Sequence, residues 1–160
     1  MAIKVGDRVP SGTFMVMTAD GPKPKTSDEL FKGKKVVLFA VPGAFTPTCH
    51  KNHLPGFVKN AAAIKAKGVD AIAVTGVNDV FVMDAWKKAS GGDAIEFLAD
   101  GSADWAKALG LTADLTERGL GVRSQRYAMV VDDGVVKTLN VEDAPGKAEV
   151  SGADNLMKML

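Results

Sequence analysis

The chain has 160 residues, of which 46% are hydrophobic, and its 20 basic side chains nearly balance its 19 acidic ones. A chain of this length can bury a core without disulfides or metal ions, so we expect a single domain over residues 1–160. The balanced charge excludes the strong electrostatic field with which proteins bind nucleic acids or anionic membranes.

Two apolar runs near the start of the chain predict strands, at Thr13–Met17 and Val36–Val41. The second run is apolar at every position, which is typical of a strand that is covered on both faces. The segment Ala19–Ser27 between them carries two prolines among polar residues. We therefore expect it to be a solvated surface loop.

Helices and strands alternate in the next part of the chain. Apolar spacing predicts a helix over Cys49–Lys67, with a kink or brief break at Pro55–Gly56 because proline disrupts a helix interior. Val69–Val74 predicts a third strand, and Asn78 is expected to cap a helix over Asp79–Ala89. This alternation favours parallel strands covered by helices.

The second half of the chain predicts shorter elements. Asp132–Gly134 is a strong turn signal, so Tyr127–Val131 and Val135–Asn140 should form an antiparallel hairpin. The remaining expected elements are a strand at Ile95–Ala99, a helix at Ser102–Leu109 and a final helix from Ser151 to Leu160. Without an internal repeat, this order predicts an α/β fold in which helices flank a central mixed β-sheet.

The only cysteine of the chain, Cys49, ends the segment Pro42–Cys49 that follows the most apolar strand. If Thr46 is the N-cap and Pro47 the first helical residue, Cys49 is the third residue of a helix. Its unpaired amide and the helix macrodipole then favour the thiolate, which is the reactive form of cysteine. Cys49 is therefore a candidate nucleophile.

Other interpretations of these residues remain open at this level. A lone cysteine is more often a small buried hydrophobe than a nucleophile, and Thr46 can be an N-cap without further role. Either Arg123 or Arg126 could be a solvated surface cation. Two histidines, His50 and His53, flank the thiol, but without a third ligand they are weak evidence for zinc, and no metal site is expected.

The segment Pro42–Cys49, followed by His53–Phe57, resembles the active-site segment of the peroxiredoxins, specifically the subfamily numbered five, which is called type II in plants. The similarity continues through Val77–Val82 and through Arg126–Gly134, so it covers nearly the whole chain. This resemblance implies a thioredoxin-like fold and a thiol peroxidase with antioxidant activity, without a cofactor.

The resemblance also implies roles for individual residues. Cys49 would attack H2O2 or an organic hydroperoxide and become a sulfenic acid. Arg126 matches the catalytic arginine of the family, which stabilises negative charge on sulfur and oxygen without titrating. Thr46 would position the peroxide, and Pro42 would shield the sulfur from water. His53 is interpreted as a structural helix residue, and His50 receives no catalytic role.

Some family members carry a second, resolving cysteine, but the corresponding segments here, Ala148–Gly152 and Ala73–Gly76, contain none. An external thiol must therefore reduce the sulfenic acid through a mixed disulfide. Glutathione, with or without glutaredoxin, is the first expectation and thioredoxin the second. The resemblance further suggests a homodimer, for which Phe45, Phe81 and Leu120 are candidate interface residues.

Two alternatives use the same residues. The thiol could serve a peroxide sensor or redox-relay protein, which would be oxidised once without efficient recycling, or it could be inert within a thioredoxin-fold scaffold. The N-terminal residues Met1–Asp7 lack the apolar core of a signal peptide, and no apolar run approaches a membrane span. We therefore expect a cytoplasmic protein that binds neither nucleic acid nor membrane.

Overall fold

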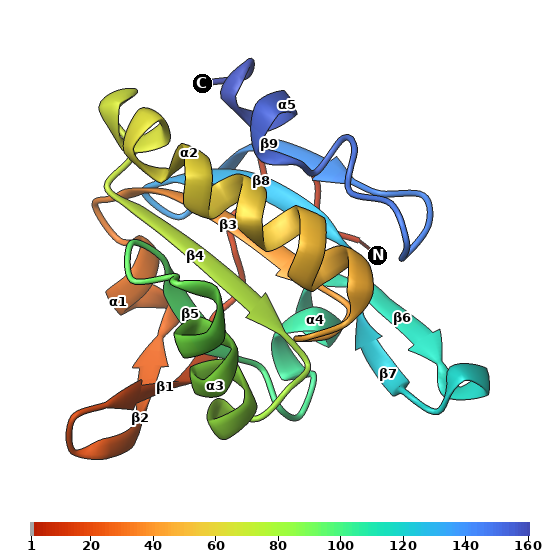
Figure 1. Ribbon diagram of the computed structural model, residues 1–160. Helices are drawn as coiled ribbons and strands as arrows, with labels where there is room; N and C mark the ends of the chain where they lie inside the picture. The colour runs from red at the N-terminus through yellow and green to blue at the C-terminus, as the bar shows by residue number, and fades with distance from the viewer. Residues whose placement is uncertain (1) are drawn as a thin grey trace.

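The computed structural model describes residues 2–160, which are built around a seven-stranded sheet (Figure 1). The sheet has the order β2-β1-β5-β4-β3-β8-β9, and β6 and β7 form a separate pair. The strands are β1 (Thr13–Thr18), β2 (Gly21–Thr26), β3 (Lys35–Val41), β4 (Ala71–Gly76), β5 (Glu96–Ala99), β6 (Thr112–Leu115), β7 (Gly121–Ser124), β8 (Tyr127–Asp132) and β9 (Val135–Val141).

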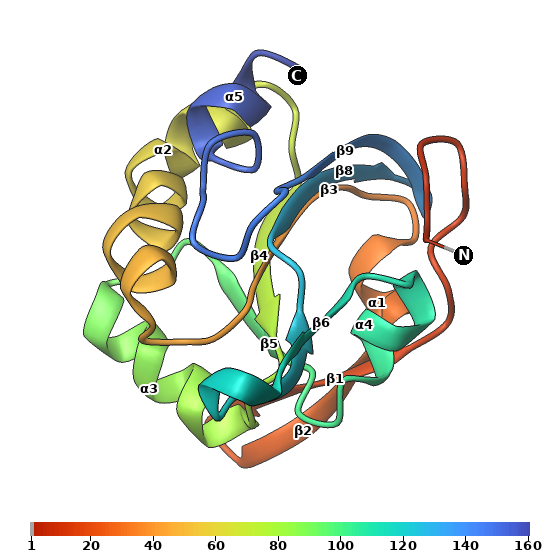
Figure 2. The same ribbon diagram turned by 90° about the vertical axis from the view of Figure 1, so that its right-hand side faces the viewer.

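The helices lie on both faces of this sheet, as Figure 2 shows. On one face lie α2 (Leu54–Ala66), α3 (Val80–Ser90) and α5 (Ala153–Met157), and on the other α1 (Ser27–Phe31) and α4 (Asp104–Leu109). A π-helix, η1 (Cys49–His53), leads into α2, and a 3-10 turn, η2 (Thr116–Arg118), precedes β7. No helix within residues 2–160 has both the length and the apolar character needed to cross a membrane.

The sheet is mixed, as expected from the sequence. β3, β4 and β5 are parallel, whereas β1 runs antiparallel to β5, and β8 runs antiparallel to both β3 and β9. The expected hairpin around Asp132–Gly134 is also confirmed, because β8 and β9 pair directly on either side of that turn. The α/β class and the helices on both faces are therefore confirmed.

The central strand β3 divides the core into two layers. Successive side chains of a strand point to opposite faces of the sheet. Val37, Phe39 and Val41 accordingly pack with α2, α3 and α5, whereas Val36, Leu38 and Ala40 pack with α1 and α4. Both cores share one sheet. The single domain expected over residues 1–160 stays a prediction. Met1, the first residue of that range, lies outside the described residues.

The prediction of a surface loop at Ala19–Ser27 is wrong. Gly21–Thr26 forms β2, and a helix follows immediately. Proline removes a donor from the sheet ladder, but an edge strand tolerates this loss because one side of its backbone faces solvent. β2 lies at the edge of the sheet, and Pro22 and Pro24 pair only with residues of β1.

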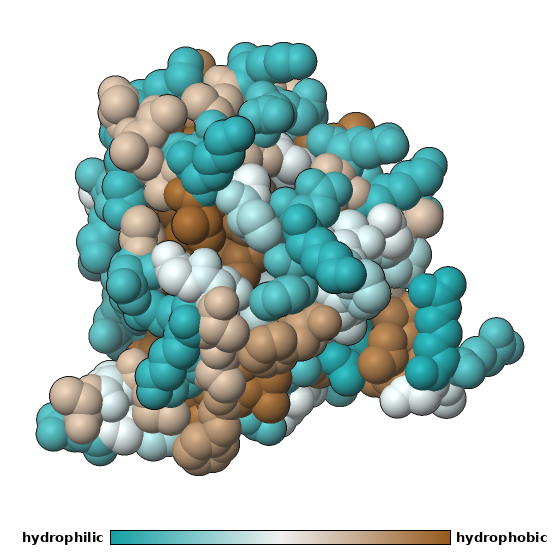
Figure 3. Space-filling model, viewed as in Figure 1, coloured by the Kyte–Doolittle hydropathy of each residue, from teal (hydrophilic) through white to brown (hydrophobic). Residues whose placement is uncertain are grey.

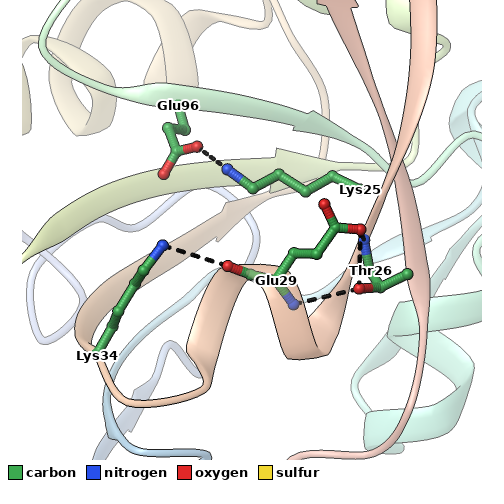
Figure 4. A network of polar contacts seen from close by, with 5 residues as sticks. All are labelled: Lys25, Thr26, Glu29, Lys34 and Glu96. Carbon is green, nitrogen blue, oxygen red and sulfur yellow. Dashed lines mark hydrogen bonds and ion pairs between the residues drawn. The ribbon is translucent and has the colours of Figure 1, made fainter.

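The end of β2 is secured by a network of polar side chains (Figure 4). The Thr26 hydroxyl accepts a hydrogen bond from the amide of Glu29, whose carboxylate accepts one from the amide of Thr26. This capping box begins α1. Lys25 forms an ion pair with Glu96 of β5 and so ties the edge strand to the interior of the sheet.

The structure corrects the predicted start of three helices. Asp79 rather than Asn78 caps α3, since its carboxylate accepts a hydrogen bond from the amide of Val82. The final helix begins at Ala153 rather than Ser151, which is fully buried. α4 begins at Asp104 rather than Ser102, because the carboxylate of Asp100 accepts hydrogen bonds from the amides of Trp105 and Ala106.

The kink or brief break expected at Pro55–Gly56 takes the form of an interruption just before these residues: the π-helix η1 ends at His53, and α2 begins at Leu54 with Pro55 in its first turn. A proline inside an α-helix clashes with the carbonyl four residues earlier and lacks its own donor. Here the preceding turn widens into the π-helix η1, in which the amide of Leu54 donates to the carbonyl of Cys49 five residues before it. The irregularity therefore spans Cys49–His53, the turn directly before the proline.

Candidate active site

The loop that carries the thiol leaves the carboxyl end of β3 and turns sharply before the helix. Phe45 has a φ of 64°, which is unusual for a residue with a side chain. The side chain of Asn78, at the end of the neighbouring strand β4, accepts a hydrogen bond of 2.9 Å from the amide of Ala44. Asn78, which was expected to cap a helix, therefore holds this loop instead.

Helical structure begins directly after Thr46. Pro47 and Thr48 are already helical, and the amide of His50 donates to the carbonyl of Thr46 at 2.8 Å. The predicted helix start is therefore present. The Thr46 hydroxyl nevertheless does not cap it: within residues 2–160 no backbone amide donates to this hydroxyl, which itself donates to the carbonyl of Gly43 at 2.6 Å. Its lone pairs remain available to accept a hydrogen bond.

The sulfur of Cys49 and the guanidinium of Arg126 meet in the interior of the protein. Nη2 of Arg126 donates to Sγ of Cys49 at 2.9 Å, and the two residues are 2% and 0% exposed. Either Arg123 or Arg126 could have been a surface cation, and the family resemblance favoured Arg126 for the place beside the thiol. The structure places Arg126 there, although these residues are 77 positions apart in the chain.

The remaining contacts of Arg126 are uncharged. Its Nε and Nη2 donate to the carbonyl of Pro145 at 3.0 and 2.9 Å, and its Nη1 contacts Nδ1 of His53 at 3.0 Å. Among residues 2–160, no carboxylate lies within ion-pair distance of this guanidinium. A buried charge is costly unless an opposite charge compensates it. The arrangement therefore directs a buried positive charge at the Cys49 sulfur.

The geometry of His53 defines its protonation. Its Nε2 lies 2.9 Å from the carbonyl of Ser151, which can only accept, so Nε2 carries the proton. Nδ1 is then free to accept from Arg126. Burial, followed by the positive charge of Arg126, lowers the pKa of His53 from 6.5 to about 3, although the bond to Ser151 opposes the shift. His53 is thus a neutral acceptor that orients Arg126, a role that the sequence interpretation missed.

Pro42 and Arg123 lie at the base of the same loop. Pro42 is buried, and its carbonyl accepts from Nη1 of Arg123 at 3.3 Å. Nε of Arg123 donates to the carbonyl of Leu120 at 2.8 Å. A Cβ at Gly43 would lie 3.0 Å from side-chain atoms of both Arg123 and Thr46, so a larger residue there would require these side chains to shift. Arg123 therefore braces the loop instead of reaching the sulfur.

The two histidines near the thiol do not converge. His53 faces Arg126, whereas Nδ1 of His50 accepts a hydrogen bond of 3.1 Å from the indole of Trp86. The His50 ring also packs against that of Phe45, with centroids 5.5 Å apart. In the part of the chain that the structure describes, no three His, Cys, Asp or Glu residues gather as they would around a metal ion.

The segment between β9 and α5 completes the site, which sequence reasoning did not foresee. The carbonyl of Pro145 accepts from Arg126, that of Gly146 accepts from the Thr48 hydroxyl at 3.0 Å, and that of Ser151 accepts from His53. These contributions come from the backbone, so residue identities gave no signal.

Comparisons with known proteins agree with this arrangement. Residues 4–157 match the Redoxin family. The chain is 52% identical to peroxiredoxin-2E-2, a chloroplastic protein of Oryza sativa subsp. japonica, over 99% of the chain and 72% of the relative. It is 48% identical to peroxiredoxin-2B of Arabidopsis thaliana, over 99% of the chain and 98% of the relative.

A solved structure is similar over almost its full length. The crystal structure of reduced Prx3 from Vibrio vulnificus in complex with H2O2 superimposes with a TM-score of 0.94. It is 53% identical in sequence, and the match covers 98% of each chain. The similarity confirms the thioredoxin-like α/β fold expected from the sequence.

The depressed pKa of His53 predicts a specific pH dependence of stability. The folded protein holds His53 neutral down to about pH 3, whereas the unfolded chain binds a proton below about pH 6.5. The contribution of neutral His53 to the free energy of unfolding is thus fully present above pH 6.5 and decreases as the pH falls toward 3. Replacing His53 by Asn, whose side-chain oxygen can still accept from Arg126, should remove this dependence.

Chemical denaturation at pH 7 and pH 4.5 measures the effect. The free energy of unfolding of the unmodified protein should fall between these pH values by about 2–3 kcal/mol more than that of His53→Asn. His50→Asn serves as the matched control. Its free energy of unfolding should depend on pH as steeply as that of the unmodified protein, because His53 is still present. Parallel pH curves for the unmodified protein and His53→Asn would contradict the assignment.

Proposed function

Because the chain belongs to the peroxiredoxin family, in the one-cysteine form of subfamily five, we propose that Cys49 reduces H2O2 and organic hydroperoxides and that an external thiol restores it. Family membership makes the protein a thiol-dependent peroxidase with an antioxidant role. The observation that carries the proposal is the buried contact between Cys49 and Arg126. It joins a nucleophile to a permanent cation.

The first step is an attack by sulfur on oxygen. The Cys49 thiolate attacks the terminal oxygen of the hydroperoxide, an S–O bond forms, and the O–O bond breaks. The sulfur loses two electrons and becomes a sulfenic acid, while the leaving oxygen takes up a proton and departs as water or an alcohol. Negative charge spreads from sulfur over both oxygens in the transition state, so fixed donors around the sulfur accelerate the step.

The surrounding residues suit this transition state. Nη2 of Arg126 already points at the sulfur, so its charge needs little rearrangement when the oxygen arrives. The Thr46 hydroxyl donates to Gly43, and its free lone pairs would accept from the hydroxyl of the peroxide. Pro42 is buried at the base of the loop and has no amide hydrogen, which is consistent with its expected role of limiting water near the thiol.

The second half of the reaction requires a partner thiol. The chain holds one cysteine, so a thiol from outside must attack the sulfur of the sulfenic acid and release water, leaving a mixed disulfide. A second thiol then attacks the mixed disulfide and regenerates Cys49. Because the sulfur is fully buried, a small thiol such as glutathione can reach it with less displacement of the chain than a protein active site. Glutathione, alone or with glutaredoxin, is therefore favoured over thioredoxin.

Location in the cell is a separate part of the proposal. One of the relatives named above is described as chloroplastic and another is not. The cytoplasmic location expected from the sequence therefore remains a prediction.

Peroxide consumption should require Cys49 and an external thiol. The unmodified protein is expected to turn over many times with glutathione, faster when glutaredoxin is added, and more slowly with thioredoxin. Cys49→Ser should consume no peroxide with any of these reductants. Sustained activity of Cys49→Ser would refute the mechanism. A single oxidation of the unmodified protein without recycling by any reductant would instead favour the sensor function.

The charge of Arg126 should control the first step. Replacing Arg126 by Ala removes a donor aimed at the developing charge, and we expect the second-order rate of Cys49 oxidation by H2O2 to fall by about 10²-fold or more. Stopped-flow fluorescence measures this rate without a reductant. Arg118→Ala removes an exposed arginine of η2 and should leave the rate unchanged. A rate for Arg126→Ala close to that of this control would exclude the electrostatic role.

We also propose that the protein forms a homodimer through the surface around the active-site loop. Phe45 and Phe81 are 46% and 65% exposed, whereas Leu120, the third candidate, is only partly exposed. Figure 3 shows apolar residues gathered over the N-terminal end of α3, where Phe81 lies. An exposed apolar cluster of this kind is typical of an interaction surface.

Sedimentation velocity tests this part of the proposal. The unmodified protein should sediment as a dimer, and Phe81→Lys should shift the population toward the monomer. Val5 is 57% exposed near the opposite end of the sheet, so Val5→Lys is the matched control and should remain a dimer. A monomeric unmodified protein, or an equally dimeric Phe81→Lys, would show that this surface is not the interface.

A further inference from the structure

The segment Glu142–Gly152, which we call the strap, connects β9 to α5 and lies beside α2 (Figure 2). Three of its backbone carbonyls accept hydrogen bonds from active-site side chains: Pro145 from Arg126, Gly146 from Thr48 and Ser151 from His53. The geometry of the site therefore depends on where this irregular segment lies. Backbone carbonyls can position other groups only if the segment itself is held in place.

A buried carboxylate holds the strap. Glu142 is 7% exposed, and its Oε2 accepts two hydrogen bonds from Ser151, one from the amide at 2.7 Å and one from the hydroxyl at 2.6 Å. These are short charge-assisted bonds, which offset the cost of burying the carboxylate. They join the two ends of the strap. Ser151 is fully buried, so its carbonyl has a defined direction.

The hairpin of β8 and β9 fixes Glu142 relative to Arg126. Arg126 immediately precedes β8 and Glu142 immediately follows β9, and the amide of Glu142 donates to the carbonyl of Arg126 at 2.9 Å. The residue that contacts the sulfur and the residue that secures the strap are therefore backbone neighbours. A movement of the strap relative to Arg126 would require this pairing or the Ser151 bonds to break.

A continuous chain of contacts then leads from the carboxylate to the sulfur. Glu142 fixes Ser151, and the carbonyl of Ser151 fixes the Nε2–H form of His53. Nδ1 of His53 consequently accepts from Nη1 of Arg126, while Pro145 accepts from its Nε and Nη2. The guanidinium is planar, so contacts on both of its sides determine where the remaining donor of Nη2 points.

We propose that Glu142 and Ser151 are positioning residues for the reaction at Cys49. Neither contacts the sulfur or the peroxide, and they act by fixing the hydrogen-bonding form of His53 and through it the direction of Arg126. Their loss would leave the guanidinium in the site but allow it to turn away from the sulfur. Small displacements of a reacting or stabilising group reduce rates strongly. This inference rests on the proposed peroxidase function.

Variants at Glu142 test the proposal with two measurements. Glu142→Ala should lower the second-order rate of Cys49 oxidation by H2O2 about 10- to 100-fold. In ¹⁵N NMR spectra of the imidazole rings, the same variant should convert His53 from the single Nε2–H form to a mixture. The chain has only two histidines, so His50→Asn assigns the signals. Glu142→Gln keeps an oxygen that can accept both Ser151 bonds and should preserve the rate within a few-fold.

Glu149→Ala is the matched control, because Glu149 is an exposed carboxylate of the same strap and should change neither measurement. The proposal is overturned if folded Glu142→Ala keeps the rate of the unmodified protein, or if it loses rate while the His53 signals stay unchanged. If Glu142→Ala does not fold, Ser151→Ala removes one of the two bonds. It should shift both measurements in the same direction, and an unchanged rate overturns the proposal.

The peroxidase function and the positioning role of Glu142 can be disproved separately. If the unmodified protein does not reduce peroxide, the proposed function fails, but the NMR spectra still show whether Glu142 determines the form of His53. If the unmodified protein reduces peroxide and Glu142→Ala does so equally fast, the positioning role alone fails.

Discussion

The guanidinium of Arg126 is a positive charge in the interior of the protein, and much of the site can be understood as the means of holding it there. Such a charge must be compensated or surrounded by acceptors. The structure supplies the carbonyl of Pro145, one nitrogen of His53 and the sulfur of Cys49. Of these acceptors only the sulfur can carry a negative charge. The same guanidinium therefore joins separate segments of the chain and points a positive charge at the thiol.

The neighbours of Arg126 reach the site from two parts of the fold: Cys49 and His53 from the helical segment after β3, and Pro145 from the segment after β9. Cys49 comes from the loop after the buried strand β3, and His53 lies one turn further along the same helical segment. The π-helix between them widens the turn before Pro55, and both residues are buried while the intervening Lys51 and Asn52 are exposed. A π-turn at a functional site is a recurring arrangement. Here it accommodates a proline and also aims two side chains at one guanidinium.

Local sequence patterns predicted the architecture well where the physical signal is local. The all-apolar β3, the turn at Asp132–Gly134 and the helix start after Thr46 were each confirmed. Patterns failed where tertiary contacts override local preference. The prolines of β2 were mistaken for a loop because the sequence does not reveal that this strand lies at a sheet edge, and Asn78 was assigned to a helix although its amide oxygen holds the active-site loop.

The sequence by itself determined that this chain forms an α/β fold around a mixed β-sheet, with a single thiol at the start of a helix. It could do so because strand periodicity, turn residues and helix-start signals act over a few neighbouring residues. The family resemblance already favoured Arg126, but only the tertiary structure decided that its guanidinium contacts the sulfur directly, that His53 is a neutral acceptor, and that Glu142 secures the segment supplying carbonyls to the site. The physical reason is that these contacts join residues far apart in the chain, largely through backbone atoms. Every residue has such atoms, so no pattern of side chains in the sequence predicts which backbone groups will reach the site.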